Sequence, residues 1–339
     1  MKKRIALALF ALLASSITSA QKLDPITEWA TRISNEAYLS QNIVYQKANS
    51  VDLKLDVITA GPSITRPVLI YFHGGGWVIG NKEGTLLKGL PYLARGMDFV
   101  NVEYRLASQS LAPAAVEDCR CALHWVAWHA KEYGFDPTKI VVAGESAGGH
   151  LALMTGMLDV EAGFDRECEL PSIKYQPGLP DQWSTGSMSE VKVAAIIDLF
   201  GITDVSDLLH PPNTRNHAVR WLGAVSNSME LARQLSPVNY ARKDSPPILI
   251  IHGDQDPVIP YEQAVRLHDA LEHVGARNQL TTIRGGGHGA TPPFAWTGEQ
   301  NLQAQEAVLD FLEKLGILQH ERTAGGGTTA GVENSGGRQ

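Results

Sequence analysis

Ser146 lies among small residues in the stretch GESAGGH, which directly follows an apolar run at residues 140–143. A serine hydroxyl is a weak nucleophile, so chemistry at this residue requires an exposed side chain and a neighbouring base. The glycines at positions 144 and 148 give GxSxG spacing, and a tight turn from a buried strand into a helix tolerates no bulk at those two positions. We therefore predict a nucleophilic serine at a strand-to-helix turn, in preference to a plain glycine-rich turn.

Such a serine needs a general base, and the base needs an acid that orients it. In a strand–turn–helix architecture the acid and the histidine follow the serine in chain order, each after a later strand. The apolar run at residues 248–251 leads into HGDQDPVIP, which offers Asp256, with Asp254 as the alternative. The run at residues 279–284 leads into GGGHG, where His288 lies among glycines. Of the 11 histidines, His288 alone combines a late strand, a following loop and the required order, so we predict it as the base.

The attack of the serine on an ester places negative charge on an oxygen, which backbone amides must stabilise. The stretch HGGGW, which begins at His73, follows an early apolar run, where this architecture supplies such amides. We favour Gly75 and Gly76 over Gly74 as donors, with the amide of Ala147 as a further donor. A phosphate-binding loop is the disfavoured alternative, because neither a GKS or GKT ending nor GxGxxG spacing is present.

The elements that position these residues follow a regular alternation. Continuous apolar runs indicate strands covered on both faces; they occupy residues 68–72, 99–102, 140–143, 193–197 and 248–251. Apolar and polar residues alternate at residues 51–58, as in a half-buried edge strand. Helical periods at residues 116–130 and 264–274 separate the runs. Because strands and helices alternate, we predict one α/β domain at residues 45–320, with a mostly parallel sheet and helices on both faces.

The N-terminal residues 1–20 have the pattern of a secretory signal peptide. Three basic residues precede an apolar run at residues 5–13, and small residues at 18–20 supply the usual cleavage positions. The apolar run is shorter than the roughly 20 residues that a membrane-spanning helix needs, so a membrane anchor is the disfavoured alternative. We expect a secreted or periplasmic protein whose mature chain starts at about Gln21 and has no membrane span.

Three other segments depart from the alternation. Residues 21–44 are expected to form an N-terminal helical segment, because apolar residues recur at spacings of four between positions 26 and 39. Residues 159–190 form a long insertion, rich in proline, glycine and charge, beside the predicted serine turn. Residues 321–339 form a low-complexity tail that we expect to be disordered, because it contains too little apolar surface to fold.

The composition excludes several function classes. The net charge is −7, and basic residues are not clustered outside the N-terminus, so nucleic acid is not expected as a partner. The three cysteines do not have metal-ligand spacing. In an exported protein Cys168 could form a disulfide with Cys119 or Cys121, and three partly buried thiols are the equal alternative.

Around Ser146, Asp256, His288 and the HGGGW stretch, the chain resembles an α/β-hydrolase serine esterase. It is similar to the group whose oxyanion motif is HGGG, as in the hormone-sensitive lipase family. It is most similar to BD-FAE-like members, the bacterial feruloyl and acetyl-xylan esterase relatives, over residues 45–316. The resemblance rests on HGGGW, YRL from Tyr104, PAA from Pro113 with Asp118, GESAGGHLA, Ser236 with Pro237, PPILIIHGDQDPVIP and GHG. Two stretches depart from the family pattern: the insertion at residues 159–190, and LASQSL at residues 106–111.

The resemblance and the residues together predict an exported serine carboxylic-ester hydrolase that needs no metal and no organic cofactor. Ser146 acts as the nucleophile, His288 as the general base and Asp256 as its partner. The expected substrates are feruloyl, acetyl or other short esters of plant polysaccharides or small molecules. Trp77, Phe294 and Trp296 are candidates to stack on an aromatic acyl group, and packing is the equal alternative for each. The rival functions are an aryl formamidase-like amide hydrolase, a general short-chain carboxylesterase of the hormone-sensitive lipase type, and a non-catalytic binding module.

Overall fold

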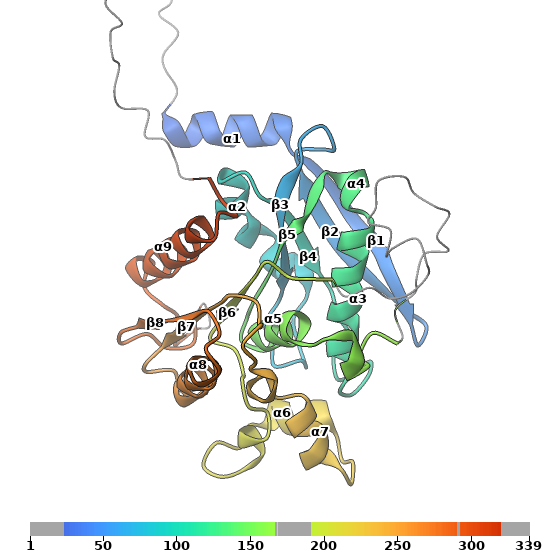
Figure 1. Cartoon of the computed structure of the whole chain (residues 1–339), viewed down its shortest axis with the longest axis vertical. Coiled ribbons are helices and arrows are strands. Elements are labelled where there is room, and N and C mark those ends of the chain that lie inside the picture. The colour runs from blue at the N-terminus through green and yellow to red at the C-terminus, as the bar shows by residue number, and fades with distance from the viewer. Residues whose placement is uncertain (1–23, 167, 169–190, 290–291, 320–339) are drawn as a thin grey trace, which may run out of the picture. The chain divides into compact units, whose positions relative to one another are not determined.

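The computed structural model describes residues 24–166, 168, 191–289 and 292–319 (Figure 1). The predicted signal peptide at residues 1–20, most of the insertion at residues 159–190 and the predicted tail at residues 321–339 lie outside these residues. The chain divides into two compact units, one ending at Ala37 and the other starting at Tyr38.

The described part of the first unit is the helix α1 (Pro25–Glu36). Asp24 caps it, because its side chain accepts hydrogen bonds from the amides of Ile26 and Thr27, each at 3.0 Å. The predicted helical segment at residues 21–44 was too long, since residues from Tyr38 onward form a strand. That strand pairs along an antiparallel neighbour, and cross-strand pairing outweighs the helical spacing of a few apolar residues. Within the described residues, no helix is long and apolar enough to cross a membrane.

The second unit is built on an eight-stranded sheet with the order β1-β2-β4-β3-β5-β6-β7-β8. The strands are β1 (Tyr38–Ala48), β2 (Val51–Thr59), β3 (Arg66–Phe72), β4 (Asp98–Val102), β5 (Phe135–Glu145), β6 (Ala195–Leu199), β7 (Ile248–Gly253) and β8 (Asn278–Ile283). The first two pairings, β1 with β2 and β2 with β4, are antiparallel, and the other five are parallel. The predicted mostly parallel α/β fold is therefore confirmed.

Helices cover both faces of the sheet (Figure 1). The α-helices of this unit are α2 (Leu90–Ala94), α3 (Ala114–Trp128), α4 (Ala130–Tyr133), α5 (Ala147–Met157), α6 (Asn216–Leu222), α7 (Ser228–Gln234), α8 (Glu262–Val274) and α9 (Gly298–Lys314). Short 3₁₀ turns lie at η1 (Lys82–Gly89), η2 (Val160–Ala162), η4 (Asp207–Leu209) and η5 (Pro237–Tyr240). Figure 1 shows α3 and α5 on one side of the sheet and α2 and α9 on the other.

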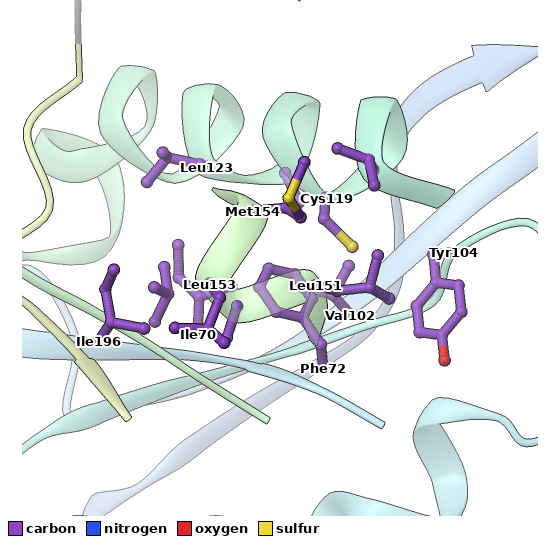
Figure 2. Packing of buried hydrophobic residues seen from close by; sticks show 14 of the residues in the cluster. Ile70, Phe72, Val102, Tyr104, Cys119, Leu123, Leu151, Leu153, Met154 and Ile196 are labelled. Atoms are coloured by element: carbon purple, nitrogen blue, oxygen red, sulfur yellow. The ribbon is translucent and has the colours of Figure 1, made fainter. Parts of the chain in front are cut away.

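The hydrophobic core between the sheet and the helices α3 and α5 explains why the sequences of the central strands are continuous apolar runs. Ile70 and Phe72 of β3 pack with Leu151 of α5 and Leu123 of α3, and all four side chains are fully buried (Figure 2). Because side chains alternate along a strand, Tyr71 points to the opposite face. Both faces of the central strands are therefore buried, and the polar residues lie at the strand ends.

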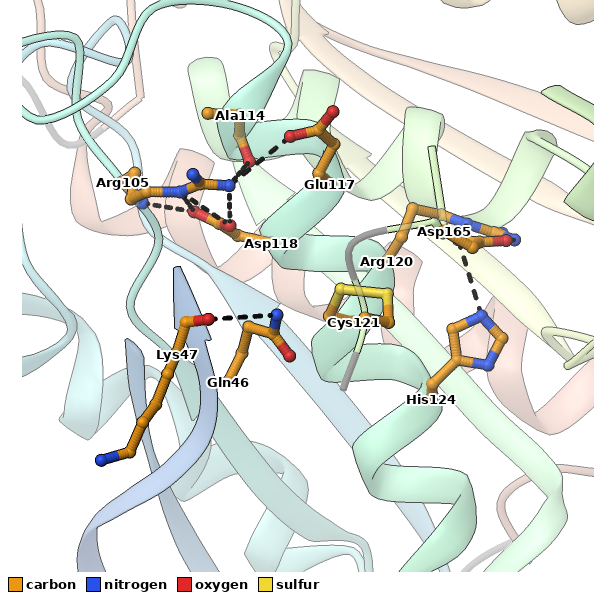
Figure 3. The surroundings of a disulfide bond; sticks show 11 residues. Gln46, Lys47, Arg105, Ala114, Glu117, Asp118, Arg120, Cys121, His124 and Asp165 are labelled. Atoms are coloured by element: carbon orange, nitrogen blue, oxygen red, sulfur yellow. Dashed lines mark hydrogen bonds and ion pairs between the residues drawn. A yellow bond between two sulfur atoms is a disulfide. The ribbon is translucent and has the colours of Figure 1, made fainter. Parts of the chain in front are cut away.

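A disulfide between Cys121 and Cys168 joins α3 to the start of the insertion. It settles the pairing that the sequence left open, since Cys119 is a buried free thiol. The same region contains a buried ion pair, in which Arg120 Nε lies 2.6 Å from Asp165 Oδ1 (Figure 3). These contacts fix the beginning of the insertion against α3.

Candidate active site

Ser146 occupies the turn between β5, which ends at Glu145, and α5, which begins at Ala147. Its backbone has φ 55° and ψ −119°, a strained conformation that non-glycine residues rarely adopt. The glycines on both sides are required by close backbone contact. A Cβ at position 144 would lie 2.2 Å from the carbonyl oxygen of Gly148, and a Cβ at position 148 would lie 2.1 Å from that of Phe72. The turn thus has the geometry that the GxSxG spacing predicts.

The structure brings together the three residues predicted from chain order. His288 Nε2 lies 2.9 Å from Ser146 Oγ, and His288 Nδ1 lies 2.7 Å from Asp256 Oδ2. Because a carboxylate only accepts hydrogen bonds, the proton on this imidazole is assigned to Nδ1, which leaves the lone pair of Nε2 facing the serine hydroxyl. The three side chains follow the carboxyl ends of β5, β7 and β8, which lie along one edge of the parallel sheet.

The carboxylate of Asp256 is held by hydrogen bonds at both oxygens. Its Oδ1 accepts from the amides of Val258 and Ile259 at 2.8 and 2.9 Å, and its Oδ2 faces His288. Burial raises the pKa of Asp256, but hydrogen bonds from His252 and His288 outweigh burial and hold that pKa well below its usual range. The carboxylate therefore stays ionised.

The alternative acid, Asp254, contacts the turn after β8 instead of the imidazole. Its Oδ1 accepts a hydrogen bond from the amide of Gly285 at 2.7 Å, and its Oδ2 lies 3.8 Å from Arg284 Nη1. These contacts close the turn after β8. No contact joins Asp254 to His288 among the residues that the structure describes, so the geometry favours Asp256.

Phe200 packs beside the imidazole and was not predicted from the sequence. Its ring meets His288 edge-on, with centroids 4.9 Å apart, and its backbone has a φ of 44°. A Cβ at position 289 would lie 2.0 Å from the Phe200 ring, so the glycine after His288 allows this close packing. The ring fixes one side of the imidazole, and no sequence motif marks a phenylalanine for this place.

The predicted oxyanion glycines line the same cavity as Ser146. Gly75 and Gly76 have φ values of 119° and 60°, which favour glycine. Within residues 24–166, 191–289 and 292–319, no atom accepts a hydrogen bond from the amides of Gly75, Gly76 or Ala147. The carbonyl of Gly75 accepts from the amides of Val78 and Ile79, both at 3.1 Å, which holds the loop in shape. Three backbone donors near the serine are therefore available to an oxyanion.

Trp77 lines neither cavity at this site, and its contacts are those of the packing alternative. Its side chain is fully buried, and its ring stacks on Trp221 with centroids 4.2 Å apart. Its Nε1 donates a hydrogen bond to His150 Nδ1 at 3.2 Å. These contacts bury an aromatic ring and satisfy its polar atom, which anchors the glycine loop to α5 and α6.

The other two aromatic candidates also lie outside the serine cavity. Trp296 is buried, donates from Nε1 to the carbonyl of Gly287 at 2.9 Å and meets Phe200 edge-on. Phe294 is 42% exposed and lines neither of the two cavities described here. Neither ring therefore lines the cavity that contains Ser146, whereas Trp296 lines the adjoining cavity.

The cavity that contains Ser146 and His288 has a volume of about 560 Å³. Its other polar side chains are His73, Asn81, Thr85, Glu145 and His217. Burial, with smaller contributions from Arg215 and His288, lowers the pKa of His217 to about 4. His217 is therefore a neutral imidazole at neutral pH.

A second cavity of about 340 Å³ adjoins the first, and both are lined by Glu145 and Phe200. Its walls are mainly apolar: Leu87, Pro91, Leu199, Trp296, Leu302 and Val308. A salt bridge of 3.1 Å between Lys88 Nζ and Glu145 Oε2 lies at this boundary. The two cavities therefore meet at Glu145 and Phe200, and Ser146 lines the first of them.

The described residues contain no group of three or more histidine, cysteine, aspartate or glutamate side chains that could hold a metal ion. The groups that meet at this site are the hydroxyl of Ser146, the imidazole of His288 and the carboxylate of Asp256.

A family model described as BD-FAE matches residues 55–271. The probable carboxylic ester hydrolase LipM of Mycobacterium tuberculosis is 30% identical over 239 residues, which make up 68% of this chain and 50% of LipM. The chain therefore spans about half the length of this curated relative, and 54% of the esterase LipC of the same organism.

Solved structures of esterases have the same fold. A propionate-bound structure of Est2, a thermophilic esterase of the planctomycete Thermogutta terrifontis, matches with a TM-score of 0.65 and 26% identity. That match covers 84% of this chain and 97% of Est2, which is also known in a form phosphorylated by paraoxon. A truncated carbohydrate esterase from gut microbiota matches with a TM-score of 0.65 and 25% identity, covering 82% of this chain and 96% of that one.

Proposed function

The chain belongs to the BD-FAE family of α/β-hydrolase esterases, and on this premise we propose that it hydrolyses carboxylic esters by acyl transfer through Ser146, His288 and Asp256. The observation that carries the proposal is the unbroken chain of contacts from Ser146 Oγ to His288, at 2.9 Å, and on to Asp256, at 2.7 Å. The match to esterases supports the same reaction class.

In the first step His288 Nε2 takes the proton of Ser146 Oγ while the oxygen attacks the ester carbonyl. The negative charge that forms on the carbonyl oxygen is stabilised by the amides of Gly75, Gly76 and Ala147. His288 then gives its proton to the departing alcohol, which leaves an acyl-serine. Water loses a proton to His288, attacks the acyl-serine and releases the acid, while Asp256 keeps the imidazole oriented and stabilises its cationic form.

The substrates in this proposal are feruloyl, acetyl or other short esters of plant polysaccharides or small molecules. The cavity around Ser146 suits a hydroxylated limb of an ester, because His217 and Asn81 offer hydrogen bonds there. The second cavity, which shares Phe200 with the first and has Leu302 and Val308 in its walls, suits an alkyl or aryl limb. The bound propionate of Est2 and the carbohydrate esterase among the solved neighbours support this substrate range.

Export is the second part of the proposal. Residues 1–20 direct secretion, and cleavage releases a chain that starts at about Gln21. The Cys121–Cys168 disulfide supports an oxidising compartment, where such bonds persist. Expression of the full chain in a bacterial host, followed by fractionation and N-terminal sequencing, tests this part. A mature N-terminus at Gln21 in the periplasm or medium is expected, and an uncleaved cytoplasmic chain contradicts export.

The reaction is tested with methyl ferulate, acetylated xylan, p-nitrophenyl acetate and N-formylkynurenine, assayed side by side. We expect ester turnover, and a loss of at least about 10³-fold in kcat for Ser146→Ala. Turnover of the formamide alone, or an unchanged rate in Ser146→Ala, contradicts the proposal.

The role of the second cavity is tested with Leu302→Glu, because Leu302 is 65% exposed and lines that cavity. We expect Leu302→Glu to raise the KM for methyl ferulate more than the KM for p-nitrophenyl acetate. Val225→Glu is the matched control, since Val225 is also exposed but lines neither cavity. Equal effects of the two variants on both substrates contradict the assignment.

A further inference from the structure

His252 lies near the end of β7, is fully buried and does not line the cavity that contains Ser146. Its Nε2 is 3.3 Å from Asp256 Oδ2 and 3.1 Å from the carbonyl oxygen of Ile259. The same Oδ2 faces His288 Nδ1 at 2.7 Å. Two imidazoles therefore share one carboxylate oxygen, one from the reacting side and one from the interior of the protein.

The neighbours of His252 fix which of its nitrogens carries a proton. Both partners of Nε2 are oxygens that accept hydrogen bonds, so Nε2 is the donor. Its Nδ1 has no hydrogen-bond partner among the described residues, and its ring meets Tyr261 edge-on with centroids 5.9 Å apart. His252 is thus a donor directed at Asp256.

A second carboxyl group, Asp198 at the end of β6, interacts electrostatically with His252 from another direction. Burial raises the pKa of Asp198 to about 7, although the nearby His252 and a hydrogen bond from Gly201 act to lower it. Asp198 Oδ1 accepts from the amide of Gly201 at 2.9 Å and would lie 2.4 Å from a Cβ at position 149 in α5. The titratable groups that face or couple to His252 are therefore Asp256, Asp198 and Tyr261, with His288 across the shared carboxylate.

We propose that His252 is a positioning residue of the relay: its Nε2–H holds Asp256 Oδ2 in the orientation that His288 needs. Four donors then surround the carboxylate, namely the amides of Val258 and Ile259 on one oxygen and the two imidazoles on the other. A carboxylate with fewer donors would be free to rotate, and it would accept more strongly from His288. The proposal rests on the proposed function, because it assigns a role within the same relay.

The test compares His252→Gln with His252→Asn. Glutamine carries an amide nitrogen at the same number of bonds from the backbone as Nε2, whereas asparagine is one methylene shorter and does not reach Oδ2. For p-nitrophenyl acetate we expect kcat to fall about tenfold in His252→Asn and less than about threefold in His252→Gln, with KM unchanged in both. A third variant, His252→Phe, removes the donor but keeps an aromatic ring at this position, and it should behave like His252→Asn.

The pH profile of kcat/KM separates positioning from a general loss of structure. Its acid limb reports the uptake of a proton by the base. Without the donor of His252, Asp256 attracts the proton on His288 more strongly, so the acid limb of His252→Asn should move to higher pH, while that of His252→Gln stays near the wild-type position. Circular dichroism and the thermal midpoint of each variant report folding separately.

Equal losses in His252→Asn and His252→Gln, with an acid limb that does not move, overturn the proposal. A His252→Asn variant that keeps full kcat overturns it as well. Failure of the proposed function is distinct: the wild-type chain would then show no ester turnover, or Ser146→Ala would retain it.

Discussion

Replacement of Asp256 by asparagine tests the relay through its proton positions. In the wild-type chain Oδ1 accepts hydrogen bonds from two backbone amides at 2.8 and 2.9 Å. The amide oxygen of the asparagine should take that position, because an NH₂ group there would face two backbone N–H groups, whereas at Oδ2 it faces two imidazoles, His252 and His288, which can change tautomer. The NH₂ group then occupies the position of Oδ2, which lies 2.7 Å from His288 Nδ1. An NH₂ group donates, so it stabilises the imidazole form with the proton on Nε2.

This change of tautomer removes the base. With a proton on Nε2, His288 offers a donor instead of a lone pair to Ser146 Oγ, which lies 2.9 Å away. The wrong tautomer costs about 10⁴-fold in kcat in a Ser-His-Asp triad, which corresponds to about 5.5 kcal/mol of activation free energy. We expect a loss of this order for Asp256→Asn with little change in KM, because the carboxylate does not touch the substrate.

The assay is steady-state hydrolysis of p-nitrophenyl acetate, with Asp254→Asn as the matched control. Asp254 lies two residues earlier and contacts Gly285 and Arg284, so its variant should keep kcat within about threefold. A loss smaller than about tenfold in Asp256→Asn, or an equal loss in Asp254→Asn, refutes the assignment of the orienting acid.

Three further predictions follow from packing, covalent structure and ionisation. Gly148→Ala places a Cβ 2.1 Å from the carbonyl oxygen of Phe72, so we expect it to lose about 3 kcal/mol or more of stability, visible as a lower thermal midpoint together with lower activity. Reduction of the Cys121–Cys168 disulfide, which has a sequence separation of 47, should lower the free energy of unfolding by up to about 4 kcal/mol, measured by urea denaturation with and without reductant. The lowered pKa of Asp256 stabilises the folded chain above the unfolded pKa of about 3.9, so the urea midpoint of the wild type should fall more steeply below about pH 4 than that of Asp256→Asn.

The parts of the fold that the sequence predicts well are those with a strong local cause. The buried strands are continuous apolar runs, and the turn at Ser146 needs glycines at two fixed positions, so both are visible in the sequence. Chain order then limits the acid and the base to the ends of later strands. His288 and Asp256 were found in this way because the parallel sheet places those ends along one edge.

The parts that the sequence does not predict depend on contacts between distant segments. The end of α1 at Glu36 is set by the pairing of β1 with β2, which no helical period reveals. A tryptophan at position 77 could line a substrate cavity or pack in the core, and the sequence does not distinguish the two. Its stacking on Trp221 shows that it packs in the core. Cys119 and Cys121 are two positions apart on α3, and residues at that spacing do not share a helix face, so the disulfide depends on which face meets Cys168.

The most direct test of the central claim is covalent labelling by a fluorophosphonate, followed by peptide mapping with mass spectrometry. Because the hydroxyl of Ser146 is activated by His288, we predict a single adduct on Ser146, its absence in Ser146→Ala, and labelling at least about 10³-fold slower in His288→Ala. An adduct on another residue, or labelling of Ser146→Ala at the wild-type rate, would contradict the account.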